Sequence, residues 1–507
     1  MSEFVVVDPS DELSVDALGE ALSARVESRG SERRSWLDTF DWRLYRAGLV
    51  LEHRASSSGR SSLVLIDLEG RRLAQLSAPA GGTPDVEDLP AGPLKEQVMS
   101  LAGLRTAFVR ASAERRVGML AVLDAEGKTV ARVAVDGPLV VRGGVEPLPA
   151  RVRVEALRGY EKDARGVANC IARSPRVRPA EETLLEAICA AEGLRPGVYR
   201  SKPKVQLDPA MSAGRAFAVL LDELVDIARV NVDGTLRQID PEFLHDLRIA
   251  VRSSRSVLKV AKGVFDERPR SHHAAELRWI GDVTTPSRDF DVYLLEFDDL
   301  VEHAMDPDAM RPFRTLLTRQ CRKAHTELNR ALRSKRFARI LDGWPDEIVA
   351  SEDPGPEADV PIAQVGGDRL RSAWRQVRRR GNAVTDASPP EALHDLRKRC
   401  KELRYLLEHL ASLYEKRAHK EIVDELRQLQ NNLGEYQDAE NQRRLILRYA
   451  EELIAQNAPA KTLVGMGRLD HYFEHRQAAV RAQFADHWTR FDRKHNRRVF
   501  ATMLESR

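Results

Sequence analysis

The chain has 507 residues, a length typical of two or three domains, and 42% of its residues are hydrophobic, which is enough to form buried cores. Lysine and arginine (80) nearly balance aspartate and glutamate (77), so the net charge of +3 favours no charged partner by itself. No apolar run approaches the roughly 20 residues that a membrane-spanning helix needs. We therefore expect a soluble cytoplasmic protein without a membrane partner.

The cysteines are four and lie far apart in the sequence: Cys170, Cys189, Cys321 and Cys400. Their spacing matches no metal-binding pattern, and cysteines in a cytoplasmic protein are usually reduced. We expect free thiols, no metal site and no cofactor.

Residues 1–192 are predicted to be rich in β-strands. Short runs of β-branched residues, such as FVVVD, GLVLEHR and SSLVLIDLEG, are separated by Gly, Asp and Glu turns. The run LDAEGKTVARVAV predicts a hairpin with Glu126 and Gly127 near its turn. Two helical segments are expected to interrupt the strands, one over residues 15–28 and one over 162–172 that resumes at 180–192.

Residues 193–214 contain Pro and Gly residues and follow neither the two-residue period of strands nor the 3.6-residue period of helices, which predicts a linker. From residue 215 to 507 apolar residues recur with a helical period and strand patterns disappear, so this part is predicted to be an all-α bundle. The acidic segment 344–361 is expected to be a solvated loop between two half-bundles, residues 215–343 and 362–507. The predicted fold class is α+β, in two domains.

An internal repeat is visible in the helical part. The segment FLHDLRIAVRSSRSVLKV (243–260) aligns without gaps on ALHDLRKRCKELRYLLEH (392–409), an offset of 149 residues. The same offset places ELRWIGDVTTPSRDFD (276–291) over ELRQLQNNLGEYQDAE (425–440). One offset across two separate helices predicts an internal duplication into two homologous half-bundles.

Each copy of the repeat carries a row of cations on one helix face. The first row is His245, Arg248, Arg252, Arg255 and Lys259, at spacings of 3, 4, 3 and 4, and the second is His394, Arg397, Lys398, Lys401 and Arg404. In the second copy, Glu408 occupies the position that corresponds to Lys259. Leu244, Leu247, Val251 and Leu258 form an apolar stripe beside the first row, which is expected to face the core.

Acids are missing along the first row, because no carboxylate occurs between Asp246 and Lys262. A solvated face is the alternative, but most solvated cation stripes are balanced by acids at helical spacing. An unbalanced, duplicated row favours a site for an anion. Arg278, Arg319, Arg322 and Lys323 are expected to extend the positive surface.

Six segments of the helical part resemble the CHAD family of histidine-containing α-helical domains. They are PEFLHDLRIAVRSSRSVLK, ELRWIGDVTTPSRDFDVYL, ALRSKRFARIL, SAWRQVRRRG, EALHDLRKRCKELRYLLE and LQNNLGEYQDAENQ, within residues 209–506. The resemblance implies a two-lobed helical domain with a basic groove that binds inorganic polyphosphate, and an association with polyphosphate granules and their proteins. Both cation rows fall on basic positions of the family, and Tyr405 matches a position where a hydroxyl reaches phosphate.

The first part resembles a degenerate CYTH domain, carried by WLDTFDWRLYRAGLVLEHR (36–54). The resemblance implies an antiparallel β-barrel whose catalytic strand reads Glu-x-Glu-x-Lys. Here the first strand is EFVVVD, with Glu3 and Asp8 but no lysine, and a later strand has Glu155 alone. We expect no enzymatic activity, with Arg54, Arg110 and Arg116 kept as candidate phosphate contacts.

Two other functions stay open. A metal-dependent triphosphatase or polyphosphatase in the barrel would need the missing carboxylates, which hold the metal. Nucleic-acid binding by the same groove is less expected, because aromatic residues are only 6% of the chain and do not interleave with the cation rows. Histidines beside an anion favour imidazolium, so polyphosphate binding is expected to tighten as pH falls from about 8 to 6.

Overall fold

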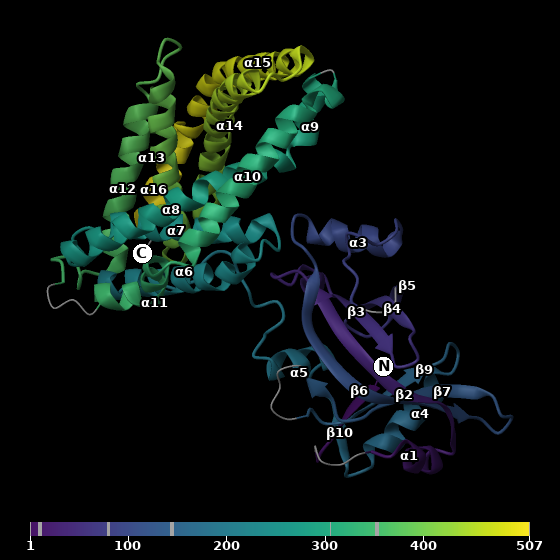
Figure 1. Cartoon of the computed structure of the whole chain (residues 1–507). Coiled ribbons are helices and arrows are strands. Elements are labelled where there is room, and N and C mark those ends of the chain that lie inside the picture. Colours follow the sequence, from purple (N-terminus) through teal and green to yellow (C-terminus); the bar gives the residue numbers. More distant parts are fainter. Residues whose placement is uncertain are drawn as a thin grey trace. The chain divides into compact units, whose positions relative to one another are not determined.

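The computed structural model describes residues 2–8, 13–78, 82–141, 147–304, 306–349 and 354–505. The chain divides into two compact units, residues 1–200 and 201–507, which are described separately here (Figure 1). Among the described helices, none is both long enough and apolar enough to cross a membrane.

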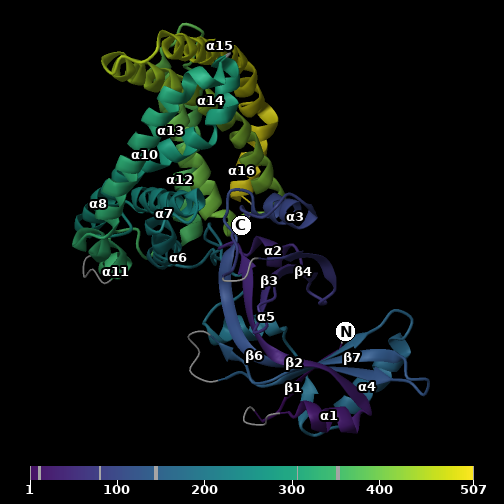
Figure 2. The same cartoon turned by 45° about the vertical axis from the view of Figure 1, so that its right-hand side comes forward.

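The first unit is built around an antiparallel sheet. Its strands are β1 (Ser2–Val6), β2 (Ala24–Asp38), β3 (Leu49–Ser56), β4 (Ser61–Asp67), β5 (Arg72–Ser77), β6 (Phe108–Leu123), β7 (Thr129–Asp136), β8 (Val140–Val141), β9 (Arg151–Ala156) and β10 (Val177–Pro179). Their order is β10-β1-β9-β7-β6-β2-β3-β4-β5, and β8 pairs with β6. The long strands β2 and β6 lie side by side and curve through the unit (Figure 2).

The sheet does not close into the expected barrel within the described residues. Closure needs the two edge strands to pair, but β10 and β5 each pair with one neighbour only. β10 has three residues and ends in Pro179, which has no N–H to donate. β5 is exposed or half-buried along its whole length, and among the described strands it pairs with β4 alone.

The helices of the first unit are α1 (Val15–Ala21), α2 (Arg43–Arg46), α3 (Pro93–Ala102), α4 (Glu161–Ala172) and α5 (Leu184–Ala191). The helix predicted over residues 15–28 is too long, because residues from Ala24 onward pair with β6 as part of β2. The segment 180–192 becomes helical only at Leu184, after a capping box formed by Thr183 and Glu186. Helix α3 was not predicted.

The second unit is helical throughout its described residues, as predicted. Its helices are α6 (Ala213–Leu236), α7 (Pro241–Val260), α8 (Glu267–Leu295), α9 (Phe297–Val301), α10 (Arg311–Leu332), α11 (Lys335–Val349), α12 (Ile362–Gly381), α13 (Pro390–His409), α14 (Lys416–Ala455), α15 (Ala460–Phe491) and α16 (Lys494–Glu505). Helix α11 includes residues 344–349, which were expected to begin a loop, and residues 350–353 lie outside the described part. The two-unit α+β class is confirmed.

Helix boundaries repeat the offset found in the sequence. Helices α6, α7, α8 and α10 begin at residues 213, 241, 267 and 311, and α12, α13, α14 and α15 begin at 362, 390, 416 and 460. Each pair of first residues is therefore 149 apart. Helices α7 and α13 also have the same length of 20 residues and both begin with a proline. The second unit consists of two copies of one helical arrangement.

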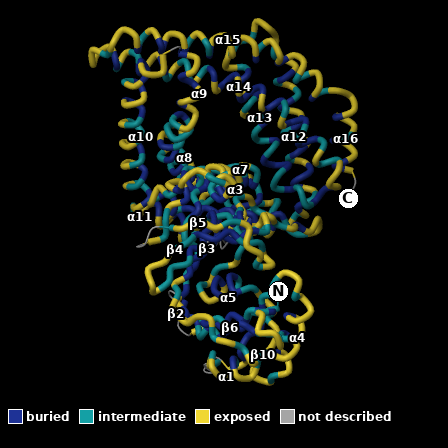
Figure 3. Tube along the Cα trace, turned by 90° about the vertical axis from the view of Figure 1, so that its right-hand side faces the viewer, coloured by how far each residue is buried: buried dark blue, intermediate teal, exposed yellow. Residues whose placement is uncertain are grey.

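The apolar stripe of α7 faces the core, as predicted. Leu244, Leu247, Val251 and Leu258 are all at most 3% exposed. Helix α7 begins where it does because the Asp240 side chain accepts hydrogen bonds from the N–H groups of Glu242 and Phe243. Buried and exposed residues alternate around the long helices of this unit (Figure 3). The cation row, offset by one residue from the buried stripe, is thereby left beside the core.

Candidate anion-binding site

Helix α8 binds Arg248 of the first cation row through hydrogen bonds. The Nη1 atom of Arg248 donates to Thr284 Oγ1 (2.8 Å) and Thr285 Oγ1 (2.9 Å) of α8. Burial lowers the pKa of Arg248, and burial together with the nearby charge of Arg278 lowers the pKa of Arg255. Arg248 and Arg255 are therefore half-buried in surroundings that disfavour their positive charge, whereas Arg252 and Lys259 of the same row are exposed.

The two cation rows meet across the repeat. The Arg252 guanidinium of α7 lies 5.8 Å from the ring centroid of Tyr405 in α13, and the Arg404 guanidinium lies 5.7 Å from the same centroid. Burial, followed by the charges of Arg397 and Arg252, lowers the pKa of Lys401 to about 8. A cation of the first copy thus acts directly on a cation of the second.

We call this set the cation cluster. It comprises the basic side chains of α7, α8 and α13 that lie close enough to act on one another: His245, Arg248, Arg252, Arg255, Arg278, Arg288, Arg397, Lys401 and Arg404. Eight of the nine were sequence candidates, and Arg288 was missed. The sequence offered a clue to Arg288, because this residue precedes Asp289, which the 149-residue offset pairs with Asp438. The cluster concentrates the local positive charge that the balanced composition lacks as a whole.

The two histidines differ in their surroundings. Burial, then the charge of Arg288, lowers the pKa of His245 to about 4, so this imidazole is neutral in the free protein from pH 6 to 8. In the second copy, Gln437 stands at the position of Arg288, and His394 Nδ1 lies 2.6 Å from Gln437 Oε1. The free protein therefore starts from an uncharged His245 in this pH range, and the effect of a bound anion on this imidazole stays a prediction.

Acids from neighbouring helices balance part of the rows, which corrects the expectation of an unbalanced face. Lys259 forms an ion pair with Glu402 of α13, and Arg397 lies 3.5 Å from Asp438 of α14. Asp289, the counterpart of Asp438 in the first copy, has a pKa raised by burial despite nearby arginines, and the charge of Asp438 raises it further. These acids are distant in sequence, so they could not be counted from the α7 segment alone.

The remaining candidates lie outside the cation cluster. Lys398 is exposed and pairs with Asp395 of its own helix at 3.5 Å. On α10, Arg319 pairs with Glu452 at 2.9 Å, while Arg322 and Lys323 are exposed. Tyr405 does belong beside the cluster, but it is only 7% exposed, and its ring rather than its hydroxyl makes the contacts with Arg252 and Arg404.

In the first unit, candidate phosphate contacts are engaged with protein groups. Arg110 lies 4.4 Å from the Trp42 ring centroid and donates to the Thr39 carbonyl oxygen (3.0 Å), and burial lowers its pKa to about 10. Arg54 forms an ion pair with Glu52 (2.6 Å). A phosphate would therefore have to displace existing partners of both arginines.

Comparison with known families finds a similarity in the second unit. Residues 219–447, all within the second unit, match the family model of the CHAD domain. The uncharacterized proteins Rv2226 and MT2285 of two Mycobacterium tuberculosis strains are each 28% identical to the chain over 279 residues, which are 53% of this chain. The matched region covers 49% of each relative, so the chain spans about half the length of the curated relatives it matches.

Two solved structures are also similar in part. The CHAD domain from the plant Ricinus communis is 21% identical, with a TM-score of 0.44, and the match covers 60% of this chain and 96% of that domain. PptA from Streptomyces chartreusis is 19% identical, with a TM-score of 0.42, and the match covers 55% of this chain and 100% of that one.

Proposed function

We propose that the CHAD domain of this protein binds inorganic polyphosphate in the cation cluster. The single observation that carries the proposal is the meeting of the two rows, in which the guanidiniums of Arg252 from one copy and Arg404 from the other lie 5.8 and 5.7 Å from the ring centroid of Tyr405. Holding like charges together in a half-buried place costs free energy, and a bound polyanion removes that cost. The association of the CHAD family with polyphosphate supports the same ligand.

The chemistry of the cluster suits a chain of phosphates. Polyphosphate carries about one negative charge per phosphate and no bases, so recognition requires only donors and positive charge in a row. Arginine forks bind phosphate oxygens with two donors, and lysine acts as a point charge. Seven of the nine members of the cluster are arginines with guanidinium groups on three different helices, which allows several successive phosphates to be held at once.

Nucleic acid is a weaker candidate for this site. Single-stranded nucleic acids are usually bound by aromatic side chains on which bases stack. The aromatic ring beside the cluster, Tyr405, is almost fully buried and is contacted by the guanidiniums of Arg252 and Arg404. Its face is therefore unsuited to receive a base.

For the first unit we propose a non-catalytic role. Its candidate metal-binding carboxylates are paired with arginines: Glu3 with Arg151 (3.2 Å) and Glu155 with Arg153 (3.2 Å). Glu52, in the sheet interior, contacts Arg34 (3.3 Å) as well as Arg54. A divalent metal would have to break these pairs. Phosphate release from tripolyphosphate with Mg²⁺ or Mn²⁺, abolished by Glu155→Ala, would overturn this proposal.

The binding proposal is tested by competition. Fluorescently labelled polyphosphate is titrated with the full-length protein, and the complex is then challenged with single-stranded DNA, RNA or unlabelled polyphosphate at equal phosphate concentration. We expect only polyphosphate to displace the label efficiently, and the Kd to rise steeply with salt. Equal displacement by DNA or RNA would assign the cluster to nucleic acids. We extend the proposal to the cell, where the protein would associate with polyphosphate granules and their proteins.

A further inference from the structure

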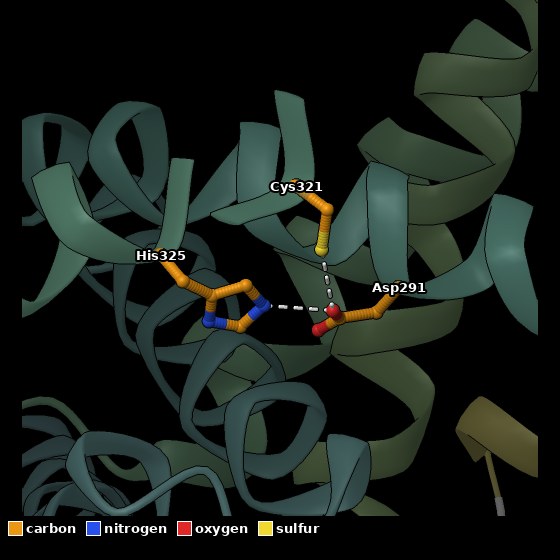
Figure 4. Close-up of side chains that lie close together, drawn as sticks. All are labelled: Asp291, Cys321 and His325. Atoms are coloured by element: carbon orange, nitrogen blue, oxygen red, sulfur yellow. Dashed lines mark hydrogen bonds and ion pairs between the residues drawn. The ribbon is translucent and has the colours of Figure 1, made fainter. Parts of the chain in front are cut away.

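A second group of chemically reactive side chains, none of them a member of the cation cluster, lies between α8 and α10. It consists of Asp291 from α8 and of Cys321 and His325 from α10 (Figure 4). Cys321 and His325 are four residues apart, so they project from the same face of α10. Both point toward the carboxylate of Asp291, as the close-up shows.

The distances within this group are short. His325 Nε2 donates to Asp291 Oδ1 at 2.7 Å, and Cys321 Sγ lies 3.7 Å from the same oxygen. One potential ligand atom from each of the three residues lies within 4.8 Å of the other two. The side chains of His325 and Asp291 are 13% and 14% exposed, so bulk water has little access to them.

These separations are close to those of a tetrahedral metal complex. With metal–sulfur bonds of about 2.3 Å and metal–nitrogen or metal–oxygen bonds of about 2.1 Å, a sulfur and an oxygen ligand lie about 3.6 Å apart. The observed separation of Cys321 Sγ and Asp291 Oδ1 is 3.7 Å. In the same geometry a nitrogen and an oxygen ligand lie about 3.4 Å apart. The His325–Asp291 pair therefore needs to open by about 0.7 Å, which a change of side-chain rotamer supplies.

We propose that Asp291, Cys321 and His325 form a binding site for a transition-metal dication of the zinc class, with water as the fourth ligand. The ligand set decides the class of metal. Thiolate and imidazole suit Zn²⁺ and its neighbours, whereas Mg²⁺ and Ca²⁺ require a shell of oxygen ligands. None of its three ligands belongs to the cation cluster, so this proposal does not rest on polyphosphate binding and is tested with its own variants.

The metal would compete with an interaction that already exists. The hydrogen bond to Asp291 raises the pKa of His325 to about 9, so at neutral pH a metal displaces a proton from this ion pair as well as from the thiol. A bound metal would connect α8 to α10 through three coordination bonds. These bonds would replace the hydrogen bond from His325 to Asp291 and the weak thiol contact of Cys321. Metal binding is therefore expected to stabilise the second unit against heating.

The test uses metal-free full-length protein titrated with Co²⁺, which replaces zinc and gives a thiolate-to-metal charge-transfer absorption when cysteine is a ligand. We expect one such Co²⁺ per chain, displaced by Zn²⁺. The absorption should disappear in Cys321→Ser, and the affinity for Zn²⁺ should fall at least about tenfold in Asp291→Asn and in His325→Ala. Circular dichroism shows whether each variant is folded.

Cys170→Ser is the matched control, because Cys170 is the exposed free cysteine of the first unit. It should leave the absorption, the stoichiometry and the effect of Zn²⁺ on the Tm unchanged. Two results would overturn the proposal: no thiolate absorption with the wild-type protein, or absorption that survives in Cys321→Ser. If Cys321→Ser fails to fold, the Asp291→Asn variant decides, and an undiminished affinity there rejects the site.

Discussion

The guanidinium of Arg252 lies over the ring of Tyr405, 5.8 Å from the ring centroid, and joins the two copies of the duplicated helical arrangement. Arg252 belongs to α7 of the first copy and Tyr405 to α13 of the second. Since Arg404 approaches the same ring, one aromatic side chain positions an arginine from each cation row. The ring therefore helps to set the spacing between the two rows.

The first prediction separates the ring of Tyr405 from its hydroxyl. Tyr405→Phe keeps the ring, so the Kd for polyphosphate should stay within about twofold of the wild-type value. Tyr405→Ala removes both cation–π contacts, each worth about 0.5–1 kcal/mol, and should weaken binding about fivefold. Fluorescence titration measures both. If Tyr405→Phe binds as poorly as Tyr405→Ala, the hydroxyl contacts phosphate, as the family resemblance implies.

The second prediction concerns pH and replaces the one made for the histidines. The pKa of Lys401 is lowered to about 8 in the free protein, and a bound polyanion raises it. Binding then takes up a proton above pH 8, so affinity should fall as pH rises from about 8 to 10 and change little between about 8 and 6. Lys401→Arg should remove the decrease, because arginine stays charged throughout.

His245 contributes in a different range. Its pKa of about 4 in the free protein would be raised by a bound anion, so its contribution tightens binding only as pH falls below about 6. Tightening between pH 8 and 6 that persists in Lys401→Arg but is lost in His245→Gln would contradict the assignment made for His245.

The third prediction concerns the acids beside the cluster. Asp289→Asn and Asp438→Asn each remove a negative charge that repels phosphate, so each should strengthen polyphosphate binding about two- to tenfold, equivalent to about 0.4–1.4 kcal/mol. Asp424→Asn is the control, since Asp424 pairs with Lys420 and Arg427 near the start of α14. Weaker binding in both test variants would mean that the acids act mainly by positioning Arg248 and Arg397.

The fourth prediction tests the packing that supports the first row. A Cβ atom at Gly234 of α6 would lie 2.2 Å from a ring carbon of Phe243, which is 1% exposed at the start of α7. Gly234→Ala should therefore destabilise the second unit by about 1–3 kcal/mol, seen as a lower Tm. Gly467→Ala, in an exposed position of α15 with open space around it, should stabilise by about 0.5–1 kcal/mol. A neutral Gly234→Ala would show that α6 and α7 can move apart freely.

Much of the second unit followed from the sequence because its determinants are local. The helical period and the 149-residue offset predicted two copies of a helical arrangement, and the helix starts repeat that offset. The buried stripe of α7 followed from the spacing of Leu244, Leu247, Val251 and Leu258. Ion-pair partners on other helices could not be predicted from the spacing within one helix. The pairing of Lys259 with Glu402 was missed for this reason.

The open sheet of the first unit and the group formed by Asp291, Cys321 and His325 were harder to predict, because both depend on contacts between elements that are distant in sequence. Closing a barrel depends on how the edge strands meet, which the alternation within each strand does not determine. The spacing of Cys321 and His325 is visible in the sequence, but Asp291 reaches them only through the packing of α8 on α10. The contrast between His245 and His394 likewise depends on Arg288 and Gln437, which are contributed by other helices.

The most direct test of the account is the affinity of Arg252→Glu/Lys401→Glu for polyphosphate at about 0.1 M salt. A charge-assisted hydrogen bond contributes about 1.5–3 kcal/mol, so losing one from each row should raise the Kd at least about a hundredfold. The control Arg371→Glu/Lys420→Glu reverses two exposed charges that are paired within their own helices, and should change the Kd by less than about threefold. An unchanged Kd in the Arg252→Glu/Lys401→Glu protein would contradict the proposal that the two cation rows hold one polyphosphate chain.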